Sequence, residues 1–173
     1  MLERMERFFD TLANWIGHAC GILMSIMMLN VFYNVVMRYF FKTGSIGMQE
    51  LEWHFFSLII LFGISYALKE DAHVRVDVIY DRLQPKRKAL INIFGAIVFI
   101  VPISVLIATG STEFVLEAYR SNEGSGDPGG LPFRWIIKGM IPLSFYLLLF
   151  INLGFIIKNI NLYRAHSCPT KEA

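Results

Sequence analysis

The sequence predicts an all-α integral membrane protein with four transmembrane helices, short interfacial amphipathic helices and both termini in the cytoplasm. The chain is 55% hydrophobic and 17% charged, whereas about 25% of the residues in a typical soluble domain are charged. Its charged residues are gathered into short segments that separate long apolar stretches. None of these stretches shows the two-residue alternation of a membrane β-barrel, so we expect helices, which satisfy their own backbone hydrogen bonds in lipid.

Four apolar stretches predict the membrane spans, at about 11–37, 51–69, 89–112 and 136–158. A helix needs about 20 mostly apolar residues to cross the hydrocarbon core of a bilayer. The uncharged part of the second stretch, 53–68, is the shortest, and we expect its flanking residues to lengthen it. The chain is predicted to form a single membrane domain, 1–173, with a cytoplasmic loop at 70–88 and a periplasmic loop at 113–135.

The distribution of basic residues predicts the direction of these spans. The N-terminal segment, the middle loop and the C-terminal tail share one side and hold 11 of the 16 Lys and Arg residues. The two loops on the opposite side hold the other five. Because Lys and Arg concentrate in cytoplasmic loops, we expect both termini and the middle loop in the cytoplasm.

Three segments outside the spans have predicted features of their own. Residues 1–15 place apolar side chains at helical spacing between charges, which predicts an interfacial helix that leads into the first span. Val76, Ile79, Tyr80 and Leu83 define one apolar face of a short middle-loop helix, which either lies against the membrane or docks another cytoplasmic element. Residues 121–130 carry the Gly, Pro, Asn and Asp signals of an irregular loop.

Each of two prolines is expected either to kink the helix that contains it or to lie where a neighbouring helix compensates. Pro102 lies inside the third span and Pro142 inside the fourth. Each proline removes one intrahelical hydrogen bond and crowds the preceding turn. After the irregular loop, Trp135 fits the aromatic belt at the membrane surface, and Arg134 and Lys138 are expected to extend toward lipid head groups.

The apolar stretches contain almost no residues for chemistry. Between the charged residues at their ends, these stretches contain no Asp, Glu, Lys or Arg. Their histidines, His18 and His54, fall near opposite ends of the membrane, so they cannot share one haem iron. We find no Gly-rich phosphate loop, Cys-x-x-Cys or His-Glu-x-x-His motif. The sequence therefore predicts a protein that is not an enzyme, with no catalytic, cofactor-binding or metal-binding residues, and that does not move a charged solute by itself.

Several motifs resemble those of a known family. They are the segment Asn34–Tyr39, the triplet Gln49–Leu51, the segment Lys69–Asp77 and the run Pro128–Lys138, followed by Ile141–Pro142–Leu143. Their order and spacing resemble the DctQ-like small membrane subunit of tripartite ATP-independent periplasmic (TRAP) transporters. The resemblance covers about residues 34–145. The chain departs from many relatives, which carry two acidic residues in place of Gln49–Glu50 and a glycine in place of Ser144.

The resemblance implies a function and a set of partners. TRAP systems import organic acid anions with an ion gradient, typically of sodium, and a periplasmic binding protein captures the anion. A large membrane subunit holds the substrate and ion sites, and the small subunit is its scaffold in the bacterial inner membrane, in contact with lipids and with no nucleic acid. Two alternatives remain from the residues alone: a membrane anchor of a respiratory oxidoreductase, and a free-standing channel or exporter.

The sequence also suggests residues for structural and docking roles. Arg38 and Glu50 flank the first outer loop and are expected either to form a charge pair or to extend separately toward the membrane surface. His73, Arg75 and Asp77 are expected either to cap and orient the middle-loop helix, because an acidic residue near a helix start is stabilised by the helix dipole, or to lie in a solvated loop. The full set of structural and interface candidates is Arg38, Tyr39, Glu50, His73, Arg75, Asp77, Arg134 and Trp135. The candidates for docking the periplasmic protein are Glu113, Glu117, Glu123 and Asp127.

Overall fold

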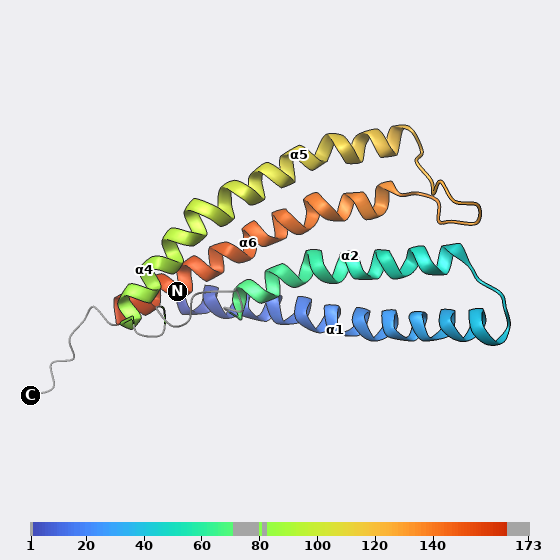
Figure 1. The fold of residues 1–173 in the computed structure, drawn as a ribbon. Helices are drawn as coiled ribbons and strands as arrows, with labels where there is room; N and C mark the ends of the chain where they lie inside the picture. The colour runs from blue at the N-terminus through green and yellow to red at the C-terminus, as the bar shows by residue number, and fades with distance from the viewer. Residues whose placement is uncertain (1, 71–79, 81–82, 166–173) are drawn as a thin grey trace, which may run out of the picture.

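The computed structural model describes residues 2–70, 80 and 83–165 (Figure 1). Its segments are α1 (Leu2–Phe40), α2 (Ile46–Lys69), α4 (Pro85–Gly95), the π-helix η1 (Ala96–Ile100), α5 (Val101–Arg120) and α6 (Trp135–Ala165). Four stretches are long and apolar enough to span a membrane, namely Arg4–Phe40, Ile46–Lys69, Pro85–Arg120 and Trp135–Arg164. This result confirms the predicted all-α fold with four transmembrane helices. Most of the predicted middle-loop helix lies outside the described residues.

The helices are longer than the spans they contain. The 39 residues of α1 extend about 58 Å at the rise of an α-helix, roughly twice the thickness of a bilayer core. The predicted N-terminal interfacial helix is therefore not a separate element but the first turns of α1. No glycine or proline interrupts residues 2–16, and the buried Phe9 packs on α6, so the helix continues without a break.

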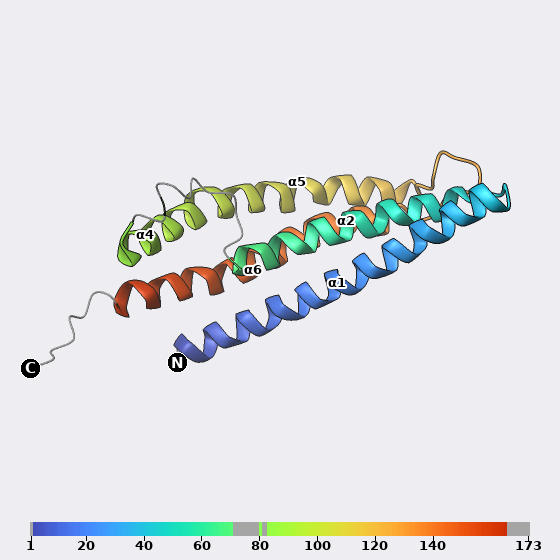
Figure 2. The ribbon, with the colours of Figure 1, turned by 60° about the horizontal axis from the view of Figure 1, so that its bottom comes forward.

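The four long helical stretches lie side by side as a row in the order α1, α2, α6, α5 (Figure 1). The loops 41–45 and 121–134 lie at one end of the row, which we call the loop end. The start of α1 and the end of α6 lie at the opposite end, which we call the terminal end (Figure 2). The row thus has two edges and two open sides.

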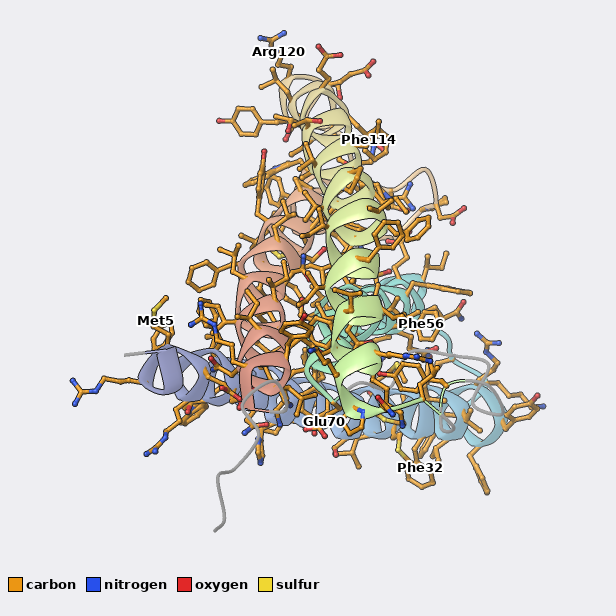
Figure 3. All side chains as sticks on the ribbon, turned by 90° about the vertical axis from the view of Figure 1, so that its left-hand side faces the viewer. Met5, Phe32, Phe56, Glu70, Phe114 and Arg120 are labelled. Atoms are coloured by element: carbon orange, nitrogen blue, oxygen red, sulfur yellow. The ribbon has the colours of Figure 1, made fainter. Side chains whose placement is uncertain are left out.

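Helix α6 is the centre of this arrangement, because it contacts every other long helix. About a third (33%) of its apolar stretch is buried, against 11% in each of the other three. The buried core consists of Leu68, Ala96, Leu148 and Phe155. Many outer side chains face away from the row, as Phe32 of α1 does (Figure 3). The chain alone therefore covers little of the apolar surface on α1, α2 and α5.

The third stretch changes its helical geometry just before Pro102. In η1 the N–H of Val101 donates to the carbonyl oxygen of Ala96, five residues earlier. This wider turn lies where the ring of Pro102 would crowd the preceding carbonyl and where its own N–H is missing. The predicted disturbance at Pro102 is thus a π-turn, whereas α6 remains one helix through Pro142.

Small residues allow the closest approaches between helices. A Cβ atom added at Gly154 of α6 would lie 2.5 Å from Cγ of Phe9, and one at Gly17 of α1 would lie 2.7 Å from Cε2 of Tyr66. Small residues commonly let membrane helices approach each other closely. The contacts of α1 with α6 and with α2 therefore depend on these two glycines.

Two buried polar side chains lack hydrogen-bond partners among the described residues. They are Ser65 of α2, through its hydroxyl, and Asn152 of α6, through both side-chain amide atoms. Both residues are fully buried. An unsatisfied buried polar group costs free energy, so these side chains do not account for the stability of the row.

The substitution Gly154→Ala tests the contact of α1 with α6. The new methyl group would overlap the buried Phe9, so α1 must shift away from α6. Overpacking of this kind costs about 1–3 kcal/mol. We expect the midpoint of thermal unfolding in detergent to fall.

Gly63→Ala is the matched control, because no atom lies within 4 Å of a Cβ added at Gly63 of α2. Alanine favours a helix over glycine by about 1 kcal/mol, so its unfolding midpoint should stay unchanged or rise. Equal losses of stability in both variants would contradict the role given to Gly154.

Candidate functional site

Glu50 is the centre of the contacts at the loop end. Ser45 caps α2, with its hydroxyl oxygen accepting from the N–H of Met48, and this cap places Glu50 in the second turn. The Glu50 carboxylate accepts hydrogen bonds from the N–H of Leu131, at 2.6 Å, and from the Ser125 hydroxyl. A guanidinium nitrogen of Arg134 lies 3.5 Å from the same carboxylate, whose side chain is only 13% exposed. We call Glu50, Ser125, Leu131 and Arg134 the Glu50 clamp.

The loop that supplies three of these partners is folded by its own hydrogen bonds. The N–H of Ser125 donates to the carbonyl oxygen of Leu131 at 3.1 Å, and the N–H of Arg134 donates to that of Glu123 at 2.9 Å. Gly130 lets the backbone approach α2, because a Cβ there would overlap Ser125 and lie 2.8 Å from Oε2 of Glu50. The predicted irregular loop therefore has a defined shape that matches the carboxylate.

Arg38, the sequence-predicted partner of Glu50, lies elsewhere. Its side chain is exposed near the end of α1, and within the described residues no ion pair joins it to Glu50. Arg38 and the exposed Tyr39 line a hollow between α1 and α2. The structure brings Glu50 together with Arg134, another predicted candidate, which lies 84 positions later in the sequence.

Two asparagines that the sequence reasoning missed join α1 to α2. Asn30 donates to the carbonyl oxygen of Met48, and Asn34 donates to Oε1 of Glu52, both at 2.9 Å. Both asparagines are buried. Their spacing of four residues on an otherwise apolar stretch is the signal that could have identified them, because polar side chains commonly hydrogen-bond between membrane helices.

The first turns of α6 are fixed by aromatic and charged contacts. The Trp135 ring packs edge-on against Tyr119 of α5, with ring centroids 5.3 Å apart. Lys138 forms an ion pair with Glu123 at 2.5 Å and lies 3.9 Å from the centre of the Phe114 ring. Lys138 thus binds its own chain, in contrast to the predicted extension toward head groups.

The four acidic docking candidates have two different environments. Glu113, Glu117 and Asp127 are exposed on α5 and the loop. Glu123 is half-buried, and its carboxylate forms an ion pair with Lys138. Arg120 lies at the same extremity of α5 (Figure 3). Three of the four candidate carboxylates are therefore exposed toward the loop end.

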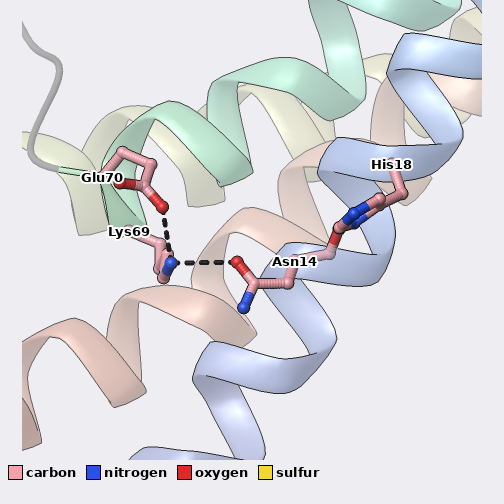
Figure 4. A network of polar contacts seen from close by, with 4 residues as sticks. All are labelled: Asn14, His18, Lys69 and Glu70. Carbon is pink, nitrogen blue, oxygen red and sulfur yellow. Dashed lines mark hydrogen bonds and ion pairs between the residues drawn. The ribbon is translucent and has the colours of Figure 1, made fainter.

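A second polar network joins the helices at the terminal end (Figure 4). Lys69 donates to Oδ1 of Asn14 at 2.9 Å and to the carboxylate of Glu70. The hydrogen bond and the charge of Lys69 hold the pKa of Glu70 below its usual range, so Glu70 is ionised at neutral pH. His18 lies 2.7 Å from the backbone oxygen of Asn14. These contacts fix the end of α2 against α1.

Helices α4 and α1 are joined to α6 by amide side chains at the same end. Asn92 of α4 donates to Oδ1 of Asn159, which in turn donates to the carbonyl oxygen of Phe155. Asn161 of α6 donates to the carboxylate of Glu6 at 2.9 Å. The remaining interface candidates, His73, Arg75 and Asp77, lie outside the described residues.

The described residues contain no group of three or more His, Cys, Asp and Glu side chains that could hold a metal ion. His18 is bound to its own helix, whereas His54 lies on α2 one turn beyond Glu50. The polar contacts of the described chain therefore join helices to one another. They are suited to holding a shape.

The substitution Glu50→Gln tests the clamp. A neutral amide cannot pair with Arg134 and is a weaker acceptor for Ser125 and Leu131. We expect backbone amides of residues 123–134 to exchange hydrogen several-fold faster, measured by mass spectrometry, and Arg134→Gln to cause a smaller increase.

The controls are Glu52→Gln, whose carboxylate bonds Asn34, and Arg38→Gln. Neither should change exchange in residues 123–134. If Arg38→Gln accelerated exchange as much as Arg134→Gln, Arg38 would have to be counted as a partner of Glu50.

The family model described as "Tripartite ATP-independent periplasmic transporters, DctQ component" matches residues 27–162. A Haemophilus influenzae protein named as a TRAP transporter small permease is 29% identical over 136 residues, which are 76% of this chain and 84% of that protein. A second protein of that species and name is 31% identical over 100 residues, or 57% of this chain and 60% of the relative. The C4-dicarboxylate TRAP transporter small permease protein DctQ of Vibrio cholerae is 27% identical over 112 residues, which are 65% of this chain and 47% of that protein.

The matched region includes the end of α1, all of α2 and α5, most of α6 and the whole Glu50 clamp. It also includes the motifs on which the sequence resemblance was based, so that resemblance is confirmed. This chain belongs to the DctQ family, the small permease subunits of tripartite ATP-independent periplasmic (TRAP) transporters.

Proposed function

We propose that this small permease subunit braces a large membrane subunit during uptake of an organic acid anion, driven by an ion gradient, most simply of sodium. A periplasmic binding protein delivers the anion. The observation that carries the proposal is the open row of helices, in which α6 contacts every other long helix and the other three bury 11% of their apolar stretches. Such a row leaves broad apolar sides for a second membrane protein and for lipid.

The polar residues support a bracing role. Glu50 in the clamp, Lys69 in the terminal-end network and Lys138 in its ion pair with Glu123 are all paired with groups of the same chain. A path for ions or a charged solute normally carries ionisable groups that face a cavity inside the membrane. The large subunit is therefore assigned the substrate and ion sites.

We propose that the terminal end faces the cytoplasm and the loop end faces the periplasm. The start of α1 and the end of α6 lie at the same end of the row (Figure 1). With four spans, the N-terminal segment, the middle loop and the C-terminal tail share one side of the membrane and hold 11 of the 16 basic residues, and cytoplasmic loops are enriched in Lys and Arg. In this orientation the exposed Glu113, Glu117 and Asp127 face the periplasmic binding protein.

The name of the Vibrio cholerae relative specifies C4-dicarboxylates. We propose an organic acid anion for the complex that contains this chain, and we take succinate as the first probe. The residues that choose the anion lie on the binding protein and the large subunit.

Reconstitution tests the bracing role. Vesicles that contain this chain and its large subunit, supplied with binding protein loaded with radiolabelled anion, should accumulate the label when sodium is higher outside. Vesicles prepared without this chain should accumulate at most background label, because the large subunit loses its brace.

Replacing external sodium by choline should also abolish uptake. Full uptake without this chain would refute the bracing role, and full uptake in choline would refute sodium coupling. The anion is identified beforehand by its binding to the periplasmic protein, with succinate tested first.

The exposed carboxylates predict electrostatic steering of the binding protein. Combining Glu113→Gln, Glu117→Gln and Asp127→Asn should slow its association with the complex roughly tenfold at low salt. Raising the salt concentration should slow association with the unmodified complex toward the rate of the triple variant, because salt screens the charges. Surface plasmon resonance measures both rates.

Lys42→Gln is the control, because it removes a positive charge instead of a negative one and the exposed Lys42 lies at the same end. It should leave the association rate unchanged or raise it. A rate that depends neither on salt nor on the three carboxylates would refute the steering.

A further inference from the structure

A cavity of about 530 Å³ lies at the terminal end of the row. Its walls come from α1, α2, α4 and α6 and include Glu6, Lys69, Lys88, Asn92, Lys158 and Asn159. Ligand sites in proteins commonly enclose about 300–1,000 Å³. The cavity therefore has the size of a small-molecule or head-group site.

The periodicity of α6 builds one wall of the cavity. Phe155, Lys158, Asn159 and Leu162 recur at intervals that place them on one face of the helix. Phe155 is buried on the inner side, whereas Lys158 is exposed. The wall thus changes from apolar to basic over a single turn.

The charges along the walls favour an anion. Three lysines line the cavity, and Glu6 is the one carboxylate among its described lining residues. An Asn161 amide already donates to Glu6, while Asn14 and Glu70 bind Lys69. Within the described chain, Lys158 has no hydrogen bond or ion pair that would occupy its ammonium group.

The cavity also lies at the depth of lipid head groups. Lys158 follows directly on the apolar part of α6, and Lys69 is the last residue of α2. Basic pockets between membrane helices at this level bind the head groups of anionic lipids. Phe155 and Leu162 offer apolar surface beside the lysines, which suits a glycerol backbone and the start of an acyl chain.

We propose that this cavity binds the phosphate head group of an anionic phospholipid, with Lys158 as the principal cationic contact. The lipid fills the space between the end of α2 and the faces of α4 and α6. It thereby adds contacts between these helices at the terminal end of the row.

Native mass spectrometry of the purified full chain in dodecyl maltoside tests the proposal. Titration with dioleoylphosphatidylglycerol should show one saturable lipid, bound more tightly than dioleoylphosphatidylcholine. Because each basic residue near an anionic lipid surface contributes about 1 kcal/mol, Lys158→Gln should weaken phosphatidylglycerol binding about fivefold. Lys158→Arg should retain it.

Lys86→Gln is the matched control. It removes the same charge at the same end, but Lys86 is not among the described lining residues, and its ammonium lies 4.9 Å from the centre of the Tyr163 ring. Phosphatidylglycerol binding should be unchanged in this variant. Equal weakening by Lys86→Gln and Lys158→Gln would show a general surface effect and overturn the cavity as the site.

Inorganic phosphate separates the two sources of the anion. It should neither bind as tightly as phosphatidylglycerol nor displace it at equal concentration; if it does either, the lipid assignment is overturned. A protein occupant is the other outcome. If the large subunit co-purifies with the unmodified chain but not with Lys158→Gln, and the chain shows no preference for phosphatidylglycerol, the lipid assignment is overturned.

Discussion

Helix α6 can contact every other long helix because its inner face carries small or well-packed side chains where its neighbours approach. Gly154 leaves room for Phe9 of α1, while Leu148 and Phe155 form the core with α2 and the third stretch. Membrane helices gain little from burying apolar surface against one another, since lipid tails are equally apolar, so close packing and hydrogen bonds must hold them together. The remaining helices are arranged by their contacts with α6.

Polar contacts at both ends of the row complete this arrangement. Glu50 binds the loop between α5 and α6 at one end, and Lys69 binds Asn14 at the other. Lipid head groups and water lie near the two ends of the row. A charged side chain there therefore costs less free energy than one in the hydrocarbon core. In contrast to these paired side chains at the ends, the side-chain amide of Asn152 is fully buried and has no hydrogen-bond partner among the described residues. The ends therefore fix the order of the helices, and the middle supplies mainly packing.

This architecture suits a subunit of a multi-pass inner-membrane transporter. A row with two open sides can lie along a larger membrane protein and contact lipid on its other side. The Glu50 clamp gives the loop end a defined surface, and the exposed carboxylates of α5 and the loop lie on it. At the terminal end, the lysine-lined cavity gives lipid a specific place between the helices. The proposed bracing role acts through shape and contacts, and it needs no reactive group.

The sequence by itself determined the number and type of the spans, because bilayer thickness and backbone hydrogen bonding restrict long apolar stretches to helices. Motifs such as Asn34–Tyr39 and Lys69–Asp77 also indicated the family, and the run Pro128–Lys138, which resembled the entry to the last helix, contains the start of α6 at Trp135. Only the tertiary structure decided which charges meet. Arg38 is close to Glu50 in sequence, yet Glu50 binds Arg134, since the packing of α2 on α6 brings distant residues together. Side-chain pairing and cavities depend on how helices lie in the row, and the periodicity of a single helix carries no information about that.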